Sequence, residues 1–106
     1  MKKILQINFK VKATGNMTPT QVEQAFLQRA QAIANVKGLL WKVYLFNEAE
    51  QTAGGIYLFK DDASVEAYLK GEMIAATKSN PIVSNFEAKV FDVLPELTRI
   101  TRGPVG

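Results

Sequence analysis

Two neighbouring segments in the middle of the chain are apolar at both alternating sets of positions, and this limits the possible folds more than any other feature. In residues 39–46 the odd positions hold leucine, tryptophan, valine and leucine, and the even positions hold leucine, lysine, tyrosine and phenylalanine. Residues 56–59 alternate aliphatic and aromatic side chains. Because successive side chains of a strand point to opposite faces, both faces of these strands are apolar. A sheet built from them needs a cover on each side.

The first third of the chain predicts a strand followed by a helix. From Ile4 to Lys12 the odd positions are apolar and the even positions after Ile4 are polar, which is typical of a strand. Thr18 can cap a helix, Pro19 takes its first position and Gln21 can complete a capping box. The helix is expected to run as far as Gly38. Its inner face is predicted to hold Val22, Phe26, Ala30 and Ile33.

The remaining two thirds predict a hairpin, a second helix and a last strand. Residues 39–46 and 54–60 are the two hairpin strands, and residues 47–52 form their polar turn. Gly54 and Gly55 are interpreted as hairpin or bulge geometry. The second helix is capped by Asp61 or Asp62 and ends at residues 80–81, and the last strand covers about residues 83–93. The inner face of the second helix is predicted to hold Val65, Leu69, Met73 and Ala76.

This order predicts an α+β fold of the ferredoxin-like βαββαβ type, with one domain over residues 1–106. Helix-length crossovers are right-handed, so both helices are expected on one face of a four-stranded antiparallel sheet. The other face is too apolar for water. We therefore expect a homodimer in which two sheets pack face to face as a dimeric α/β barrel.

The face without helices is expected to contain a few polar groups among aromatic rings. The first strand places the amides of Gln6 and Asn8 on that face, and we expect Tyr44, Tyr57 and Phe59 beside them. Such a mixture is typical of a small-ligand pocket. The same residues also suit a plain dimer core with tyrosine hydroxyls at its rim.

The composition excludes several classes of chemistry. The chain has neither cysteine nor histidine, which excludes disulfides, thiolate nucleophiles, zinc sites, histidine general bases and histidine-ligated haem. No metal site is expected. The net charge of +3 comes from basic residues spread between Lys2 and Arg102, so no nucleic-acid partner is expected. No segment resembles a signal peptide or a membrane span, and the expected location is cytoplasmic.

Four segments resemble the YdhR family of small bacterial monooxygenases: residues 39–43, 53–59, 67–69 and 88–93. The resemblance covers most of the chain after Gly38. The family is similar to the antibiotic-biosynthesis monooxygenases, which are dimeric barrels that oxygenate electron-rich aromatic substrates, some of them without metal or flavin. The resemblance thus implies a cofactor-independent monooxygenase acting on a small aromatic or polyketide-like substrate.

That activity requires groups that hold a flat ring and stabilise its anion. Trp41, Tyr44, Tyr57 and Phe59 can stack on a ring, and Gln6 lies among them in the expected pocket. The candidate catalytic residues are Asn8, Tyr57 and Lys42, with Asn8 as a hydrogen-bond donor to an oxyanion and Lys42 or Lys89 as a cation.

Structural alternatives stand beside these assignments. Trp41 shares its alternation with two aliphatic residues, so it also fits a core position beneath a helix. Lys42 and Lys89 also fit the protection of sheet edges against unwanted pairing. The alternative functions are a non-catalytic binder of hydrophobic metabolites and a stress-related dimeric barrel with a filled interior.

Overall fold

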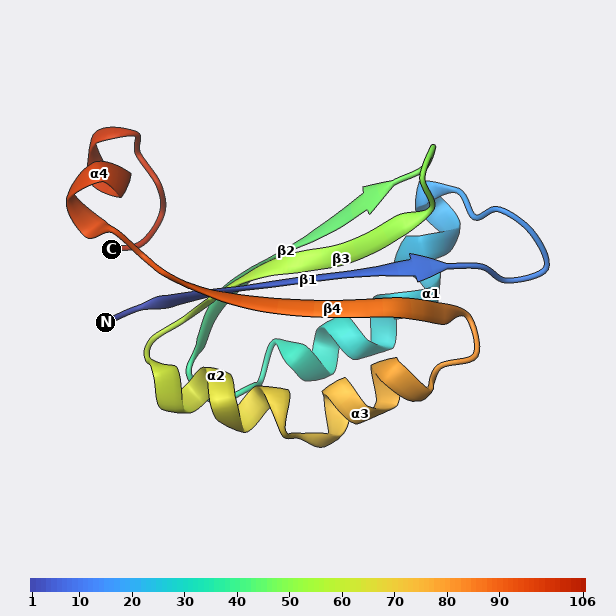
Figure 1. The fold of residues 1–106 in the computed structure, drawn as a ribbon, viewed down its shortest axis with the longest axis horizontal. Coiled ribbons are helices and arrows are strands. Elements are labelled where there is room, and N and C mark those ends of the chain that lie inside the picture. Colours follow the sequence, from blue (N-terminus) through green and yellow to red (C-terminus); the bar gives the residue numbers. More distant parts are fainter.

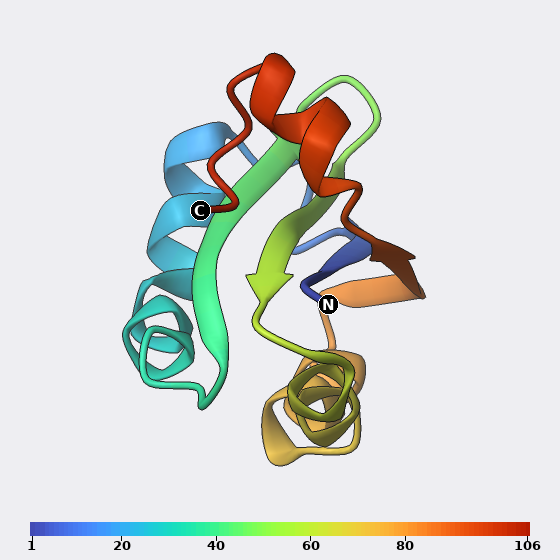
Figure 2. The ribbon, with the colours of Figure 1, turned by 90° about the vertical axis from the view of Figure 1, so that its left-hand side faces the viewer.

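Four antiparallel strands form a sheet in the order β2-β3-β1-β4 in the computed structural model, which describes residues 1–106. The helices α1, α2 and α3 lie on one side of this sheet, and α4 lies beyond its end on the other side (Figures 1 and 2). The ferredoxin-like α+β prediction is confirmed. No helix is both long enough and apolar enough to cross a membrane. The elements are β1 (Lys3–Val11), α1 (Pro19–Ile33), β2 (Leu39–Asn47), β3 (Thr52–Phe59), α2 (Asp62–Leu69), α3 (Glu72–Ser79), β4 (Val83–Asp92) and α4 (Pro95–Ile100).

Helix α1 begins as the sequence predicts. The Gln21 N–H donates to the Thr18 hydroxyl at 3.2 Å, and the Thr18 N–H donates to the Gln21 side chain at 2.8 Å, which completes the capping box. The helix ends at Ile33, earlier than expected. Gly38 lies beyond it in the left-handed region with φ 85°, and a Cβ there would come 2.1 Å from the Ser64 hydroxyl. The glycine therefore allows the close approach of the α1–β2 connection to α2.

The predicted second helix is divided into α2 and α3. Gly71 separates them and is the N-cap of α3. Asp61 caps α2 by accepting a hydrogen bond from the Ser64 N–H at 2.9 Å, and hydrogen bonds from Ser64 lower the pKa of this carboxyl group. Because of this break, the residues that face the sheet differ from those predicted for one continuous helix. The buried positions are Val65, Tyr68 and Ile74, while Leu69 and Met73 are half-buried and Ala76 is exposed.

Strand register decides which side chains face the helices. Leu5 lies opposite Tyr57 on the neighbouring strand, and residues directly opposite each other share a face of the sheet. Both belong to the core beneath the helices, as does Phe59. Gln6 lies opposite Ile56 on the other face. The expectation that the amides and the aromatic side chains share the helix-free face is therefore wrong.

A bulge in β2 separates Leu39 from the alternation that Trp41 follows. Leu39 lies opposite Phe59, but Trp41 lies opposite Leu58, so Leu40 is an extra residue and the alternation shifts by one. Trp41 keeps its alternation with Val43 and Leu45, but pairing with β3 places all three on the helix-free face, so a place for Trp41 beneath a helix is wrong. In β2 the helix side is occupied instead by Lys42 and its same-face neighbours.

The C-terminal residues fold back onto their own sheet. The Trp41 indole N–H donates to the Pro104 carbonyl at 2.8 Å, and Val105 is buried against Leu58 and Val93. These last residues therefore cover part of the helix-free face of their own sheet. Helix α4 is different, because its apolar side chains are exposed. These are Leu94, which precedes the helix, and Leu97 and Ile100 within it.

We predict that Trp41→Phe loosens this tail. Phenylalanine keeps a ring but removes the N–H donor to Pro104, and one hydrogen bond contributes about 1 kcal/mol. Urea denaturation is expected to show that loss in the free energy of unfolding. Amide hydrogen exchange is expected to accelerate in residues 101–106. Unchanged exchange in the tail would contradict the role given to this bond.

Candidate active site

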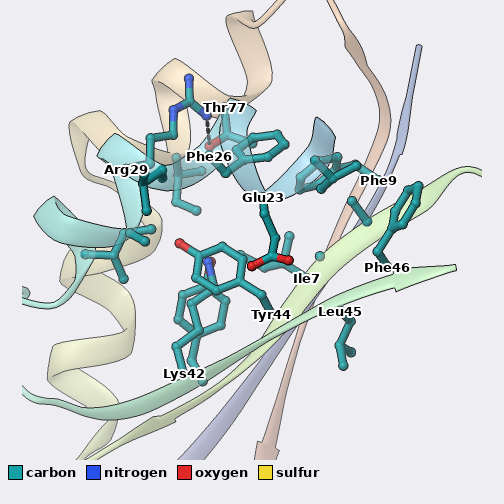
Figure 3. Close-up of a pocket in the computed structure, with 18 of the residues that line it drawn as sticks. Ile7, Phe9, Glu23, Phe26, Arg29, Lys42, Tyr44, Leu45, Phe46 and Thr77 are labelled. Carbon is teal, nitrogen blue, oxygen red and sulfur yellow. Dashed lines mark hydrogen bonds between the residues drawn. The ribbon is translucent and has the colours of Figure 1, made fainter. Parts of the chain in front are cut away.

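A cavity of about 370 Å³ lies between the helix side of the sheet and helices α1 and α3 (Figure 3). Its mouth is marked by lining residues that are exposed, which include Glu23 and Leu27 on α1 and Tyr44 on β2. A mostly apolar cavity with a few polar groups is the usual form of a small-molecule site. Its apolar walls include Ile7, Phe9, Val22, Phe26, Ile74 and Phe86.

Lys42 brings an amine into this apolar cavity. Its ammonium nitrogen lies 3.7 Å from the centre of the Tyr44 ring and 4.3 Å from that of Tyr57. It has no hydrogen bond or ion pair; the two ion pairs of the chain, Lys3–Asp92 and Arg99–Glu96, lie elsewhere. The side chain can lie across the sheet because residue 55 is glycine.

Gly55 therefore has a role other than the predicted hairpin or bulge. Its pairing partners on both sides are regular, and the hairpin turn lies after Asn47. A Cβ at position 55 would come 2.6 Å from Cε of Lys42. The missing side chain makes room for the lysine. Gly54 instead allows close backbone approach, since a Cβ there would come 1.9 Å from the Ile7 carbonyl oxygen.

Burial, followed by the nearby positive charge of Arg29, lowers the pKa of Lys42 to about 7. The two tyrosine rings favour the ammonium form and so oppose this shift. Loss of water around the amine is the larger effect. At pH 7 and above, a large share of the Lys42 side chains is thus neutral and able to accept a proton.

Two tyrosine hydroxyls meet beneath the cavity. The Tyr68 hydroxyl of α2 donates to the Tyr57 hydroxyl of β3 at 3.2 Å, and both side chains are buried. Burial, followed by the neighbouring Tyr68, raises the pKa of Tyr57. Burial also raises the pKa of Tyr68. Both hydroxyls therefore keep their protons near neutral pH and can act as hydrogen-bond donors.

Arg29 places a second cation at the cavity. Its guanidinium donates to the Thr77 hydroxyl at 2.9 Å and to the Ala76 carbonyl at 3.3 Å, which connects α1 to α3. It also lies 5.7 Å from the centre of the Phe26 ring. Neither Arg29 nor Tyr68 is among the site residues predicted from the sequence. The sequence signal that could have identified them is a polar side chain beside or within the inner face of a helix, which is Arg29 in α1 and Tyr68 in α2.

The structure brings together some of the predicted site residues and separates others. Lys42, Tyr44 and Tyr57 line the cavity. Phe59 is completely buried in the adjoining core. The other candidates lie on the opposite face of the sheet: Gln6, Asn8, Trp41 and Lys89.

Asn8 borders a separate polar groove with Lys10, Glu50 and Glu87. No group of three or more acidic residues comes together in the way a metal site requires.

The fold is shared with small α+β proteins of known structure. A protein of unknown function from Nitrosomonas europaea shares 23% identity, with a TM-score of 0.67 and coverage of 88% of this chain and 89% of that one. The heme-degrader MhuD from Mycobacterium tuberculosis, with two hemes bound in its active site, shares 25% identity at a TM-score of 0.62, with coverage of 86% and 95%. SnoaB, a cofactor-independent oxygenase from Streptomyces nogalater, shares 18% identity at a TM-score of 0.64, with coverage of 89% and 97%.

Sequence comparison gives the family. Residues 4–104 match the family described as "Putative mono-oxygenase ydhR", so the chain belongs to this family of monooxygenase-type proteins. No curated protein sequence matches the chain. The resemblance seen in the strand segments is therefore confirmed over almost the whole chain.

Proposed function

We propose that this protein is a cofactor-independent monooxygenase that oxidises a small aromatic or polyketide-like substrate in the cavity between the sheet and the helices. The observation that carries this proposal is the desolvated amine of Lys42 within apolar and aromatic walls. Family membership and the shared fold with SnoaB support it.

Lys42 supplies the step that such an oxidation needs first. Dioxygen reacts with a substrate that donates an electron readily, and a phenol or enol does so as its anion. The neutral amine takes the hydroxyl proton and becomes an ammonium ion beside the new oxyanion. A cation in an apolar cavity stabilises that anion far more than it would in water. The Tyr57 hydroxyl, which stays protonated, is a further hydrogen-bond donor nearby.

The substrate itself can supply all the electrons of the reaction. A ring CH₂ that is activated by a neighbouring phenolate becomes C=O, while one oxygen atom of O₂ enters the product and the other leaves as water. The carbon loses four electrons and O₂ gains four, so no external reductant is required. The walls of the cavity hold the ring and limit access of water to the anion.

Oxygen consumption with small phenols, naphthols and anthrones tests this function. Using ¹⁸O₂, we expect one labelled atom in the product and one in water, without added flavin or metal. Background-level consumption with all three substrate classes would contradict the proposal. A ligand that is retained but unchanged after aerobic incubation would instead identify a hydrophobic-metabolite binder, and absence of any bound ligand would favour a structural barrel.

Haem is a second candidate ligand because the heme-degrader MhuD shares the fold. We favour a substrate other than haem because this chain has no histidine to bind iron. A hemin titration separates the two candidates. A one-to-one Soret shift at micromolar hemin that competes with naphthol binding would favour haem.

We predict a defined pH dependence for the oxidation. Since the neutral amine accepts the substrate proton, the rate is expected to rise as pH increases through about 7 and to level off by about pH 8. The measurement is kcat/KM for a phenol between pH 6 and 9. A rate that falls across this interval would contradict the base role of Lys42.

We also propose that the helix-free face joins two copies of the chain. Val43 is 50% exposed, Leu45 is 38% exposed and Phe91 is 47% exposed, and all three lie on this face. Gln6 and Asn8 lie between them on β1. An apolar area of this kind with polar groups at its centre suits a self-complementary interface between two sheets. The tail already covers the end of the face near Leu58.

A further inference from the structure

Lys42 has the surroundings of a nucleophilic lysine as well as those of a base. It is the one lysine that lines the cavity, and it is anchored on a central part of β2, away from the strand ends. Its amine has neither an ion pair nor a hydrogen bond to hold it as ammonium. Its neighbours are ring faces and apolar walls.

We propose that Lys42 captures aromatic aldehydes in the cavity as a Schiff base. The amine nitrogen attacks the carbonyl carbon, and the C=O electron pair moves to oxygen to give a carbinolamine. The carbinolamine then loses its oxygen as water, with both hydrogens of the amine, and a C=N bond remains. The balance is R–CHO plus Lys–NH₂ giving R–CH=N–Lys plus H₂O, with no oxidant or reductant. This activity does not depend on the proposed oxygenation.

The groups around Lys42 supply what this addition requires. Lysine is nucleophilic when neutral, and desolvation in an apolar pocket is a usual way to make it so. The protonated hydroxyl of Tyr57 can donate a hydrogen bond to the carbonyl oxygen, and the hydrogen bond from Tyr68 supports it. The mostly apolar walls offer few partners to the water that would hydrolyse the imine.

The charged and titratable groups that face the amine leave it free to react. Arg29 on α1 opposes protonation of Lys42. Glu23 lines the cavity mouth but forms no ion pair with the amine. Tyr44 is held in its protonated form because burial raises its pKa. No negatively charged group is therefore paired with the amine, and burial outweighs the attraction of the Tyr44 and Tyr57 rings for the ammonium form.

The cavity favours an aromatic aldehyde over a small aliphatic one. Its walls include the rings of Phe9, Phe26 and Phe86, and Tyr44 stands at its mouth beside the amine. A flat ring can pack among these groups with its aldehyde directed at the lysine. The cavity volume of about 370 Å³ is within the range of small-molecule pockets.

Reductive trapping with 2-naphthaldehyde and cyanoborohydride, under nitrogen at pH 7.5, tests the proposal. Ordinary lysines, with a pKa near 10.5, are neutral in only about one molecule in a thousand at this pH. After allowance for a weaker nucleophile, we expect Lys42 to be labelled about 100-fold faster than the exposed Lys12 and Lys60. Peptide mapping by mass spectrometry gives the rate at each site.

Two comparisons make the test specific. The labelling rate of Lys42 is expected to level off above about pH 8, whereas that of an ordinary lysine with a pKa near 10.5 has no such plateau there. Gly55→Ala displaces the Lys42 side chain and is expected to remove its advantage while leaving Lys12 unchanged.

Labelling of Lys42 no faster than that of Lys12 in the wild-type protein would overturn the proposal, whatever the variant does. Because oxygen is absent, failure of the oxygenase assay leaves this result unaffected.

Discussion

Replacing Lys42 with methionine is expected to lower the rate of substrate oxidation at pH 8 about 100-fold or more, since removal of one group that stabilises an oxyanion typically lowers rates 10²- to 10³-fold. Methionine preserves an unbranched apolar side chain in the cavity, so the walls keep their packing. The amine that accepts the substrate proton is lost. We expect kcat to fall, with the rise in rate near pH 7 abolished.

Lys89→Met is the matched control for this variant. Lys89 lies opposite Gln6 on the helix-free face, outside the cavity, so its removal is expected to leave at least half of the oxidation rate. Thermal unfolding by circular dichroism checks that both variants are folded. A folded Lys42→Met protein with wild-type kcat and an unchanged pH profile would show that another group activates the substrate.

Replacing Val43 with glutamate is expected to convert a dimer into a single chain of 11.7 kDa. In a two-fold symmetric interface the same patch occurs on both copies, so the substitution places two carboxylates in one apolar contact. Burying an unpaired charge is strongly unfavourable. Light scattering after gel filtration at about 10 μM protein measures the mass.

Val90→Glu provides the same substitution on the other face of the sheet. Val90 is 42% exposed and lies opposite Leu5, on the helix side. We expect this variant to keep the wild-type mass. A wild-type protein that is already a single chain at this concentration, or a Val43→Glu variant that remains a dimer, would contradict the proposed interface.

The element order and the helix starts could be predicted because their signals are local. Thr18 and Gln21 form a capping box that depends only on residues close in sequence. The alternation in β1 can likewise be recognised without knowing which strands pair with it. The break at Gly71 is weaker in the sequence, because glycine within a helical pattern does not always end a helix.

The faces of the central hairpin could not be predicted because both are apolar. A shift of one residue moves every side chain of a strand to the other face. The bulge at Leu40 produces such a shift ahead of Trp41, and pairing with β1 places Tyr57 under the helices. These facts depend on long-range pairing. The amino-acid composition of the strands does not indicate the bulge or the pairing.

Only part of the candidate site could be predicted from the sequence, for the same reason. Lys42 was identified as a candidate cation, but an edge strand also explains a lysine. Its importance depends on Gly55 from the next strand and on Arg29 from α1, which are distant in sequence. Only the three-dimensional structure shows that the Lys42 side chain passes over Gly55 into an apolar cavity.

Titration of the Lys42 amine is the most direct test of this account. With ¹³C-labelled lysine, the Cε resonance that disappears in the Lys42→Met spectrum can be followed by NMR from pH 5 to 11. We predict a midpoint near 7 for this resonance. A midpoint near 10.5, the ordinary value for lysine, would contradict both the base and the nucleophile assigned to the cavity.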